Sequence, residues 1–143
     1  MAETLATLTD KVELYLMDTS NKSWLATAIE IYIRMALLDI NAATGVTYAI
    51  KDLDAAPATT LQTKHIPILI MGSAAYAARS RQLDRLEKVD VPGVGTEATF
   101  GDWASWQMGL FEKRLEEIRT QGIHGSSTAP HTAADWEEEP KTW

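Results

Sequence analysis

The segment formed by residues 24–43 constrains the fold most, because it is apolar around almost the whole circumference of a predicted helix. Its hydrophobic side chains do not share one face: Trp24, Leu25, Ile29, Ile31, Tyr32, Ile33, Met35, Leu37, Leu38 and Ile40. Only Glu30, Arg34 and Asp39 provide a charged edge. A helix of this kind is buried on several sides. In so small a chain, we expect part of this surface to meet another subunit.

Three further segments show helical periodicity, and together they indicate an all-α, four-helix bundle-like domain. The predicted helices span residues 4–17, 24–43, 67–89 and 103–121. The first and last carry apolar positions three and four residues apart, which is typical of amphipathic helices. The predicted domain organisation is a helical domain over residues 1–121 and a flexible acidic arm over residues 122–143.

Residues that favour helix ends set the expected boundaries. Ser23 is expected to cap the second helix, and Gly45 follows its last residue as a C-terminal cap. Pro67 suits the first turn of the third helix, where its missing N–H group has no intrahelical partner to lose. Asp102 is expected to cap the fourth helix and Gly122 to end it.

Small and aromatic residues indicate how the helices pack. Gly72 lies inside the third predicted helix, where it is less favourable than alanine by ~1 kcal/mol, so we expect it to permit close approach of the second helix. Trp24, Trp103 and Trp106 are expected in the core. Residues 46–50, VTYAI, favour a short strand, because β-branched and aromatic residues cluster there. With no obvious partner inside the chain, this strand is expected to extend along a neighbouring subunit.

Composition narrows the class of protein. A chain of 143 residues is the size of one domain with one core. The absence of cysteine excludes disulfides, thiolate nucleophiles and cysteine zinc sites. The net charge of −7 argues against sequence-independent nucleic-acid binding, which requires clustered lysine and arginine. The longest uncharged run, residues 65–78, is shorter than the ~20 apolar residues that span a bilayer. We therefore expect a soluble protein without a signal peptide or a membrane partner.

The sequence contains no pattern typical of a catalytic or metal site. The three histidines, His65, His124 and His131, lack the spacing of metal ligands. The serines lie in turns or in helices with no nearby histidine, so no nucleophilic triad is indicated. The glycine-rich segment at residues 92–95 follows a predicted helix and lacks a Gly-Lys-Ser/Thr continuation, which indicates a turn. We expect no enzyme activity and no cofactor.

The last 22 residues, GIHGSSTAPHTAADWEEEPKTW, have the composition of a tail that is too polar and too rich in small residues to form a core. They nevertheless contain two of the five tryptophans of the chain. Exposed tryptophan is a frequent anchor in protein–protein contacts. The predicted partner-binding residues are therefore Trp136, Glu137, Glu138, Glu139 and Trp143.

The order of these elements resembles that of phage head–tail connector, or adaptor, proteins. The first helix contains L-x-x-x-V-x-x-Y-L from Leu8, and a turn ending in the pattern Ser-x-Trp/Leu, here Ser23-Trp24-Leu25, leads to the long apolar helix. Residues 66–88, IPILIMGSAAYAARSRQLDRLEK, are similar to the third helix of that group. A tryptophan-containing helix that ends in FEKRLEEIR follows. The resemblance covers about residues 5–120 and is one of pattern.

This resemblance implies a homo-oligomeric ring, usually twelve-fold, beneath the capsid portal. Such a ring joins the portal protein to the tail or to a second neck protein, and the C-terminal segment extends into the portal. DNA then passes through the lumen without specific binding, which suits an acidic wall. The implied location is the neck of the virion, and the host cytoplasm during assembly.

A second interpretation remains open from the residues alone. The chain is also compatible with a cytoplasmic helical regulatory module, antitoxin-like or adaptor-like, whose acidic tail mimics nucleic acid or occupies a basic groove. Co-purification separates the two, because portal and tail proteins accompany the chain only if it is a connector.

Overall fold

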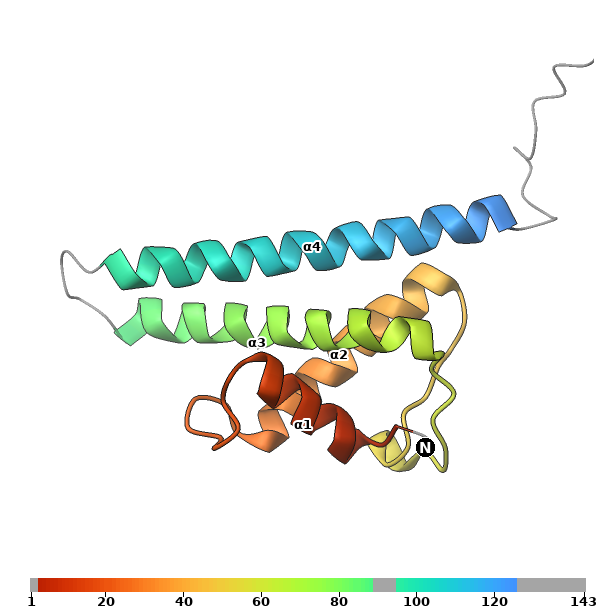
Figure 1. Ribbon diagram of the computed structural model, residues 1–143, viewed down its shortest axis with the longest axis horizontal. Coiled ribbons are helices and arrows are strands. Elements are labelled where there is room, and N and C mark those ends of the chain that lie inside the picture. Colours follow the sequence, from red (N-terminus) through yellow and green to blue (C-terminus); the bar gives the residue numbers. More distant parts are fainter. Residues whose placement is uncertain (1–2, 89–94, 126–143) are drawn as a thin grey trace, which may run out of the picture.

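A computed structural model describes residues 3–88 and 95–125, and these ranges form an all-α fold with four α-helices (Figure 1). The helices are α1 (Leu5–Tyr15), α2 (Ala26–Thr44), α3 (Ile66–Lys88) and α4 (Gly95–Gly125). Two short 3₁₀ turns, η1 (Leu53–Ala55) and η2 (Thr63–His65), lie between α2 and α3. The helical-bundle fold predicted from the sequence is confirmed.

The four helices pack around one core. α3 and α4 run antiparallel and lie side by side, while α2 crosses behind α3 and α1 packs in front (Figure 1). The core is built from apolar side chains of all four helices and of the segment between α2 and α3. Its largest fully buried members are Phe111, Leu8, Ile29, Ile33, Ile40, Ile50, Leu69 and Val12. Each helix therefore buries one side against the others.

The close approach expected at Gly72 is present, but the neighbour is α4 instead of α2. A Cβ atom built on Gly72 would lie 2.4 Å from Cε2 of Phe111. The Phe111 ring is 1% exposed and also contacts Tyr76, with ring centroids 6.2 Å apart in an edge-to-face arrangement. The missing side chain at Gly72 thus makes room for the aromatic ring that joins α3 to α4.

The two ends of α2 differ in how well they were predicted. Gly45 adopts the left-handed conformation with φ of 72°, and its N–H group donates to the carbonyl of Asn41 at 2.9 Å, as expected for a C-terminal cap. The prediction that Ser23 caps the N-terminus is wrong. Leu25 is the capping residue, and its side chain makes no capping hydrogen bond.

Ser23 is unavailable as a cap because its backbone belongs to a turn organised by Asp18. The carboxylate of Asp18 accepts hydrogen bonds from the N–H groups of Lys22 (3.0 Å), Ser23 (2.9 Å) and Trp24 (3.0 Å). Burial of the Asp18 carboxylate raises its pKa, but these donors outweigh burial and hold the pKa below its ordinary value. The polar turn between α1 and α2 is thereby fixed.

The boundaries predicted for the last helix are wrong at both ends. α4 begins at Gly95 and continues to Gly125, so Asp102 and Gly122 lie inside it and do not cap it. At the first end, Gly101 is buried against Gln82 of α3, whose Nε2 would lie 2.6 Å from an added Cβ. Packing on α3 therefore extends the helix through residues whose intrinsic preference favours a turn. The predicted boundary between residues 121 and 122 falls within α4.

The strand expected at residues 46–50 does not form, and no strand occurs among residues 3–88 and 95–125. Instead, the end of this segment is held by backbone contacts within the same chain. An isolated bridge joins Lys51 to Thr4, and the N–H group of Leu5 donates to the Lys51 carbonyl at 3.0 Å. Tyr48 and Ile50 are buried in the core, which explains their apolar character without a strand.

Candidate interaction surfaces

The arm residues predicted to bind a partner, Trp136, Glu137, Glu138, Glu139 and Trp143, lie outside the described residues. The described ranges contain three other candidate sites. Two are exposed apolar surfaces, one on α2 and one formed by α1 with α4. The third is a cavity between α3 and α4.

The first surface is a line of exposed apolar residues along α2, here called the α2 stripe: Ile31, Met35, Leu38 and Ala42. Spacings of four, three and four residues place them on one side of the helix. Their exposure is substantial for bulky side chains, at 52% for Ile31, 39% for Met35 and 60% for Leu38. An isolated exposed leucine is ordinary, but a continuous stripe on one helix is a candidate interface.

The α2 stripe lies opposite the side of α2 that forms the core. The core-facing residues of α2 are Ile29, Ile33, Ala36, Leu37, Ile40 and Ala43. At 3.6 residues per turn, Ile33 and Ile40 lie about half a turn away from Ile31 and Leu38. Because α2 is the rear helix in Figure 1, its stripe faces away from the side of the molecule drawn there.

Two charged residues beside the α2 stripe, Arg34 and Asp39, have partners within the subunit. Arg34 donates to both carboxylate oxygens of Asp54, at 3.0 Å from Nε and 2.7 Å from Nη2. This bidentate contact lowers the pKa of Asp54 below its ordinary value. On the other side, Asp39 accepts a hydrogen bond from the Tyr76 hydroxyl. Burial and the Asp39 carboxylate raise the pKa of Tyr76 to about 12. The apolar stripe therefore has a satisfied polar rim, the usual anatomy of an interface.

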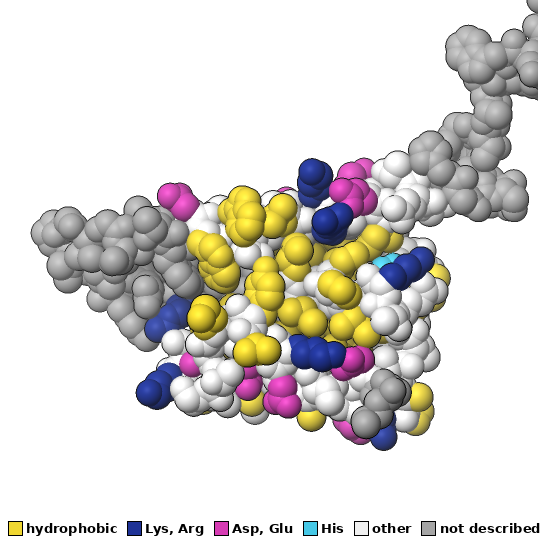
Figure 2. All heavy atoms as spheres, in the orientation of Figure 1, with side chains coloured by type: hydrophobic (Ala, Val, Ile, Leu, Met, Phe, Trp, Pro, Cys, Tyr) yellow, Lys and Arg dark blue, Asp and Glu magenta, His cyan; other side chains and the backbone are white. Residues whose placement is uncertain are grey.

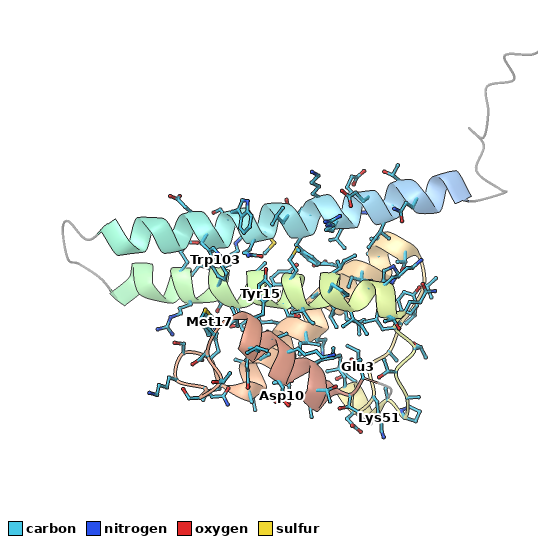
Figure 3. All side chains as sticks on the ribbon, viewed as in Figure 1. Glu3, Asp10, Tyr15, Met17, Lys51 and Trp103 are labelled. Carbon is cyan, nitrogen blue, oxygen red and sulfur yellow. The ribbon has the colours of Figure 1, made fainter. Side chains whose placement is uncertain are left out.

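The second surface lies on the front of the molecule, at the end of α1. Leu14, Tyr15 and Met17 are 67%, 41% and 91% exposed. The Tyr15 hydroxyl donates to Oε1 of Gln107 at 3.0 Å and so fixes this end of α1 against α4. Figure 3 shows Tyr15 and Met17 on the same side as Trp103, and hydrophobic side chains gather over α1, α3 and α4 on this face in Figure 2.

The tryptophans predicted to lie in the core are not equally buried. Trp24 is half-buried at the edge of the core, where its Nε1–H group donates to the Ala77 carbonyl at 3.0 Å. Arg81 lies 5.4 Å from the Trp24 ring centroid, which is cation–π geometry. Trp103 is also half-buried, whereas Trp106 is 59% exposed, so its predicted place in the core is wrong. Ala104 and Gln107 occupy the buried positions around it because they face the bundle.

The third site is a cavity of about 360 Å³ between the start of α3 and the second half of α4, here called the α3–α4 cavity. Its apolar lining comes from Ile68, Met71 and Ile118. Lys64 and the ion pair between Arg114 and Glu117, 2.9 Å apart, add charge to this lining. The size and the mixture of apolar surface with a few polar groups are typical of small binding sites.

His65 lines the α3–α4 cavity and carries an unsatisfied atom. The side chain is only 5% exposed, and its ring meets Tyr48 edge-on with centroids 5.6 Å apart. Nδ1 is the one buried side-chain nitrogen or oxygen, within the ranges that the structure describes, that has no hydrogen-bond partner. Burial, and secondarily the charge of Lys64, lower the pKa of His65 below its ordinary value, so the ring is neutral at pH 7.

Two acidic groups in another cavity, Asp39 and Glu116, are engaged in local contacts. One further cavity, of about 400 Å³, is lined by Asp39, Glu116 and Arg119 among others. Asp39 accepts from Tyr76, and Glu116 pairs with Arg119 at 3.2 Å. Among the described residues, no group of three or more histidine, aspartate or glutamate side chains is arranged to hold a metal ion. The described part of the chain also has no helix long and apolar enough to cross a membrane.

In comparisons with known proteins, no family model, no curated protein and no solved structure matches the chain. The candidate sites therefore depend on the chemistry of the chain alone.

The sequence indicated one of these three sites and did not indicate the other two. The surplus of apolar residues in residues 24–43 indicated an external contact, and the structure places that surplus on the α2 stripe. The α3–α4 cavity was missed because its two walls are about 50 residues apart in the sequence. The signal that could have found it is the antiparallel pairing of α3 with α4, which brings the residues after Lys64 to those near Ile118.

Proposed function

We propose that this protein is a structural head–tail adaptor of a tailed bacteriophage, which forms a ring under the portal and links the capsid to the tail. The observation that carries the assembly part of this proposal is the α2 stripe, an exposed apolar line on a helix whose other side fills the core. Monomeric proteins rarely expose contiguous apolar surface of this kind without a partner.

The positions of the two apolar surfaces favour a ring over a simple dimer. The α2 stripe lies on the side of α2 opposite the core, and Leu14, Tyr15 and Met17 lie at the end of α1, so the two surfaces are separate. A contact between two different surfaces is heterologous, and it closes into a ring when the rotation between subunits permits. A two-fold dimer would bury only one of the two surfaces.

The phage assignment rests on the sequence pattern of the four helices and on the tryptophan-containing C-terminal segment. In this proposal, residues 136–143 bind the portal protein, and a tail or second neck protein binds the opposite end of the ring. The net charge of −7 is compatible with a lumen through which DNA passes without specific binding.

The first experiment measures assembly of the full chain alone and with the portal protein encoded in the same genome. We expect a monomer or weak association alone, by sedimentation velocity, and closed rings on the portal in electron micrographs. A stable dimer that does not bind portal protein would contradict the proposal. Co-purification with a regulatory partner and without portal or tail proteins would instead support the helical regulatory module.

The second experiment tests the α2 stripe itself with a matched control. Met35→Ser with Leu38→Ser removes apolar surface from the stripe and should abolish rings while the chain stays folded. Leu25→Ser is the control, because Leu25 is 68% exposed and apolar but lies off the stripe at the start of α2. Equal loss of rings in both variants would show that general surface hydrophobicity, and not the stripe, drives assembly.

A further inference from the structure

The α3–α4 cavity has two properties that together define the chemistry of its ligand. Its lining is apolar at Ile68, Met71 and Ile118, and Lys64 adds a positive charge. A matching ligand has an apolar body with negative charge close by. Tryptophan next to glutamate meets both requirements.

Charge also distinguishes between the two tryptophans of the C-terminal segment. Trp136 is followed directly by Glu137, Glu138 and Glu139, whereas Trp143 follows Lys141 and Thr142. Lys64 makes no ion pair within residues 3–88 and 95–125, so its ammonium group can attract a carboxylate. The acidic run therefore places Trp136, and not Trp143, next to the charge that the cavity offers.

The length of chain beyond α4 permits this contact within one subunit. Gln121 lines the cavity, and Gly125, the end of α4, lies four residues later, about 6 Å along the helix axis. From Gly125 to Trp136 the chain can span at most about 36 Å. A flexible chain of that length has a typical end-to-end distance of roughly 18 Å. The cavity is thus within easy reach of Trp136 of the same chain.

We propose that the α3–α4 cavity is a binding site for the chain's own C-terminal segment, with the indole of Trp136 inside it and the following glutamates near Lys64. The inference goes beyond the head–tail assignment and does not depend on ring formation. In an assembly, a partner that binds residues 136–143 would have to displace this segment from the cavity first.

The test uses the full chain with Trp136→Ala as the receptor, because this variant leaves its own cavity free. The probe is a fluorescein-labelled peptide of residues 133–141, AADWEEEPK, and binding is followed by fluorescence anisotropy. We expect the variant to bind the peptide and the unsubstituted chain to bind it about tenfold or more weakly, since a short linker gives a local concentration of order 1 mM. A peptide with alanine in place of its tryptophan should not bind.

Two controls locate the binding site. In the Trp136→Ala background, Lys64→Glu should weaken peptide binding a few-fold, the range expected for one exposed charge pair, while Lys22→Glu, in the turn before α2, should have no effect. Equal binding by the unsubstituted chain and by the Trp136→Ala variant would overturn the proposal, and so would equal effects of the two charge reversals.

A nuclear magnetic resonance measurement separates contact within one chain from contact between copies. The indole N–H resonance of Trp136 in the full chain should keep the same shift at all protein concentrations, and its protons should show Overhauser effects to methyl groups of Ile68, Met71 or Ile118. A shift that depends on concentration would assign the cavity to the segment of a second copy and overturn the proposal. These outcomes are independent of whether the portal protein binds.

Discussion

The two sides of α2 are almost equally apolar, yet only one of them has a partner inside the subunit. Ile33 and Ile40 are fully buried against the other helices, whereas Ile31 and Leu38 are 52% and 60% exposed. The same residue types therefore serve two purposes that composition cannot separate. Which side becomes the core is decided by where α1, α3 and α4 pack.

A similar contrast exists between two buried polar side chains near α3. Ser73 is fully buried, and its hydroxyl donates to the Leu69 carbonyl at 2.7 Å. His65 is 5% exposed, but its Nδ1 atom has no partner within the described ranges. The hydroxyl of Ser73, inside the bundle, has a local hydrogen-bond partner, whereas one ring nitrogen of His65 has none among the described residues. The surfaces on which binding is proposed are marked by the exposed apolar side chains of the α2 stripe and by the apolar lining of the α3–α4 cavity.

The largest expected effect separates the two sides of α2. Ile33→Ala should lower the free energy of unfolding by about 2–5 kcal/mol, because it leaves a cavity in the core. Leu38→Ala should change it by less than about 0.5 kcal/mol, as usual for exposed positions. Urea denaturation at low protein concentration measures both. If Leu38→Ala destabilises the monomer as much as Ile33→Ala, the α2 stripe has a partner within the subunit.

The next effect tests the core side of α3. Gly72→Ala should lower the free energy of unfolding by about 1–3 kcal/mol, because the Phe111 ring must move to admit the new methyl group. Phe111→Leu in the same chain should recover part of this loss, which makes the two effects non-additive. Thermal denaturation of the single and double variants gives the coupling. Strict additivity would show that the contact between Gly72 and Phe111 does not determine the packing.

A smaller change in the free energy of unfolding, of opposite sign, is expected at Leu25, an exposed apolar residue outside the α2 stripe. Leu25→Ser should raise the free energy of unfolding by about 1 kcal/mol, because serine at the N-terminal cap can accept a hydrogen bond from a free N–H group of α2. Chemical denaturation measures the change. Lower stability in this variant would mean that Leu25 contributes packing that outweighs the missing cap.

The smallest expected effect is a pH dependence at His65. Its pKa in the folded chain is below the ordinary value of 6.5, so the unfolded chain binds more protons in this range. The contribution of His65 to stability is fully present above pH 6.5 and is lost as the pH falls through the folded pKa. Unfolding measured from pH 7.5 to 5 should show this slope, and His65→Gln should reduce it. An unchanged slope in the variant would assign the pH dependence to other groups.

The fold class and three of the four helices were accessible from the sequence because their signals are local. Hydrophobic spacing fixed the positions of α1, α2 and α3 to within a few residues, and Gly45 marked the end of α2 through its left-handed conformation. The start of α4 was missed because Gly101 packs on Gln82, a contact between residues 19 positions apart. The cap at Leu25 was missed because Asp18 holds the N–H group of Ser23.

The sites show the same division between local and long-range information. The sequence indicated that residues 24–43 have more apolar surface than one core requires, but not that Ile31, Met35 and Leu38 are the exposed ones. It gave no indication that His65 would lie in a cavity with Ile118, since their spatial relation depends on the pairing of α3 with α4.

By itself, the order of residues determined that this chain is helical and rich in apolar surface, because periodicity and composition act over a few neighbouring positions. Only the tertiary structure decided which of those surfaces became core, which remained outside, and where a polar atom was left without a partner. The physical reason is that burial and hydrogen-bond satisfaction are properties of contacts between distant segments, and those contacts exist only once the helices have packed.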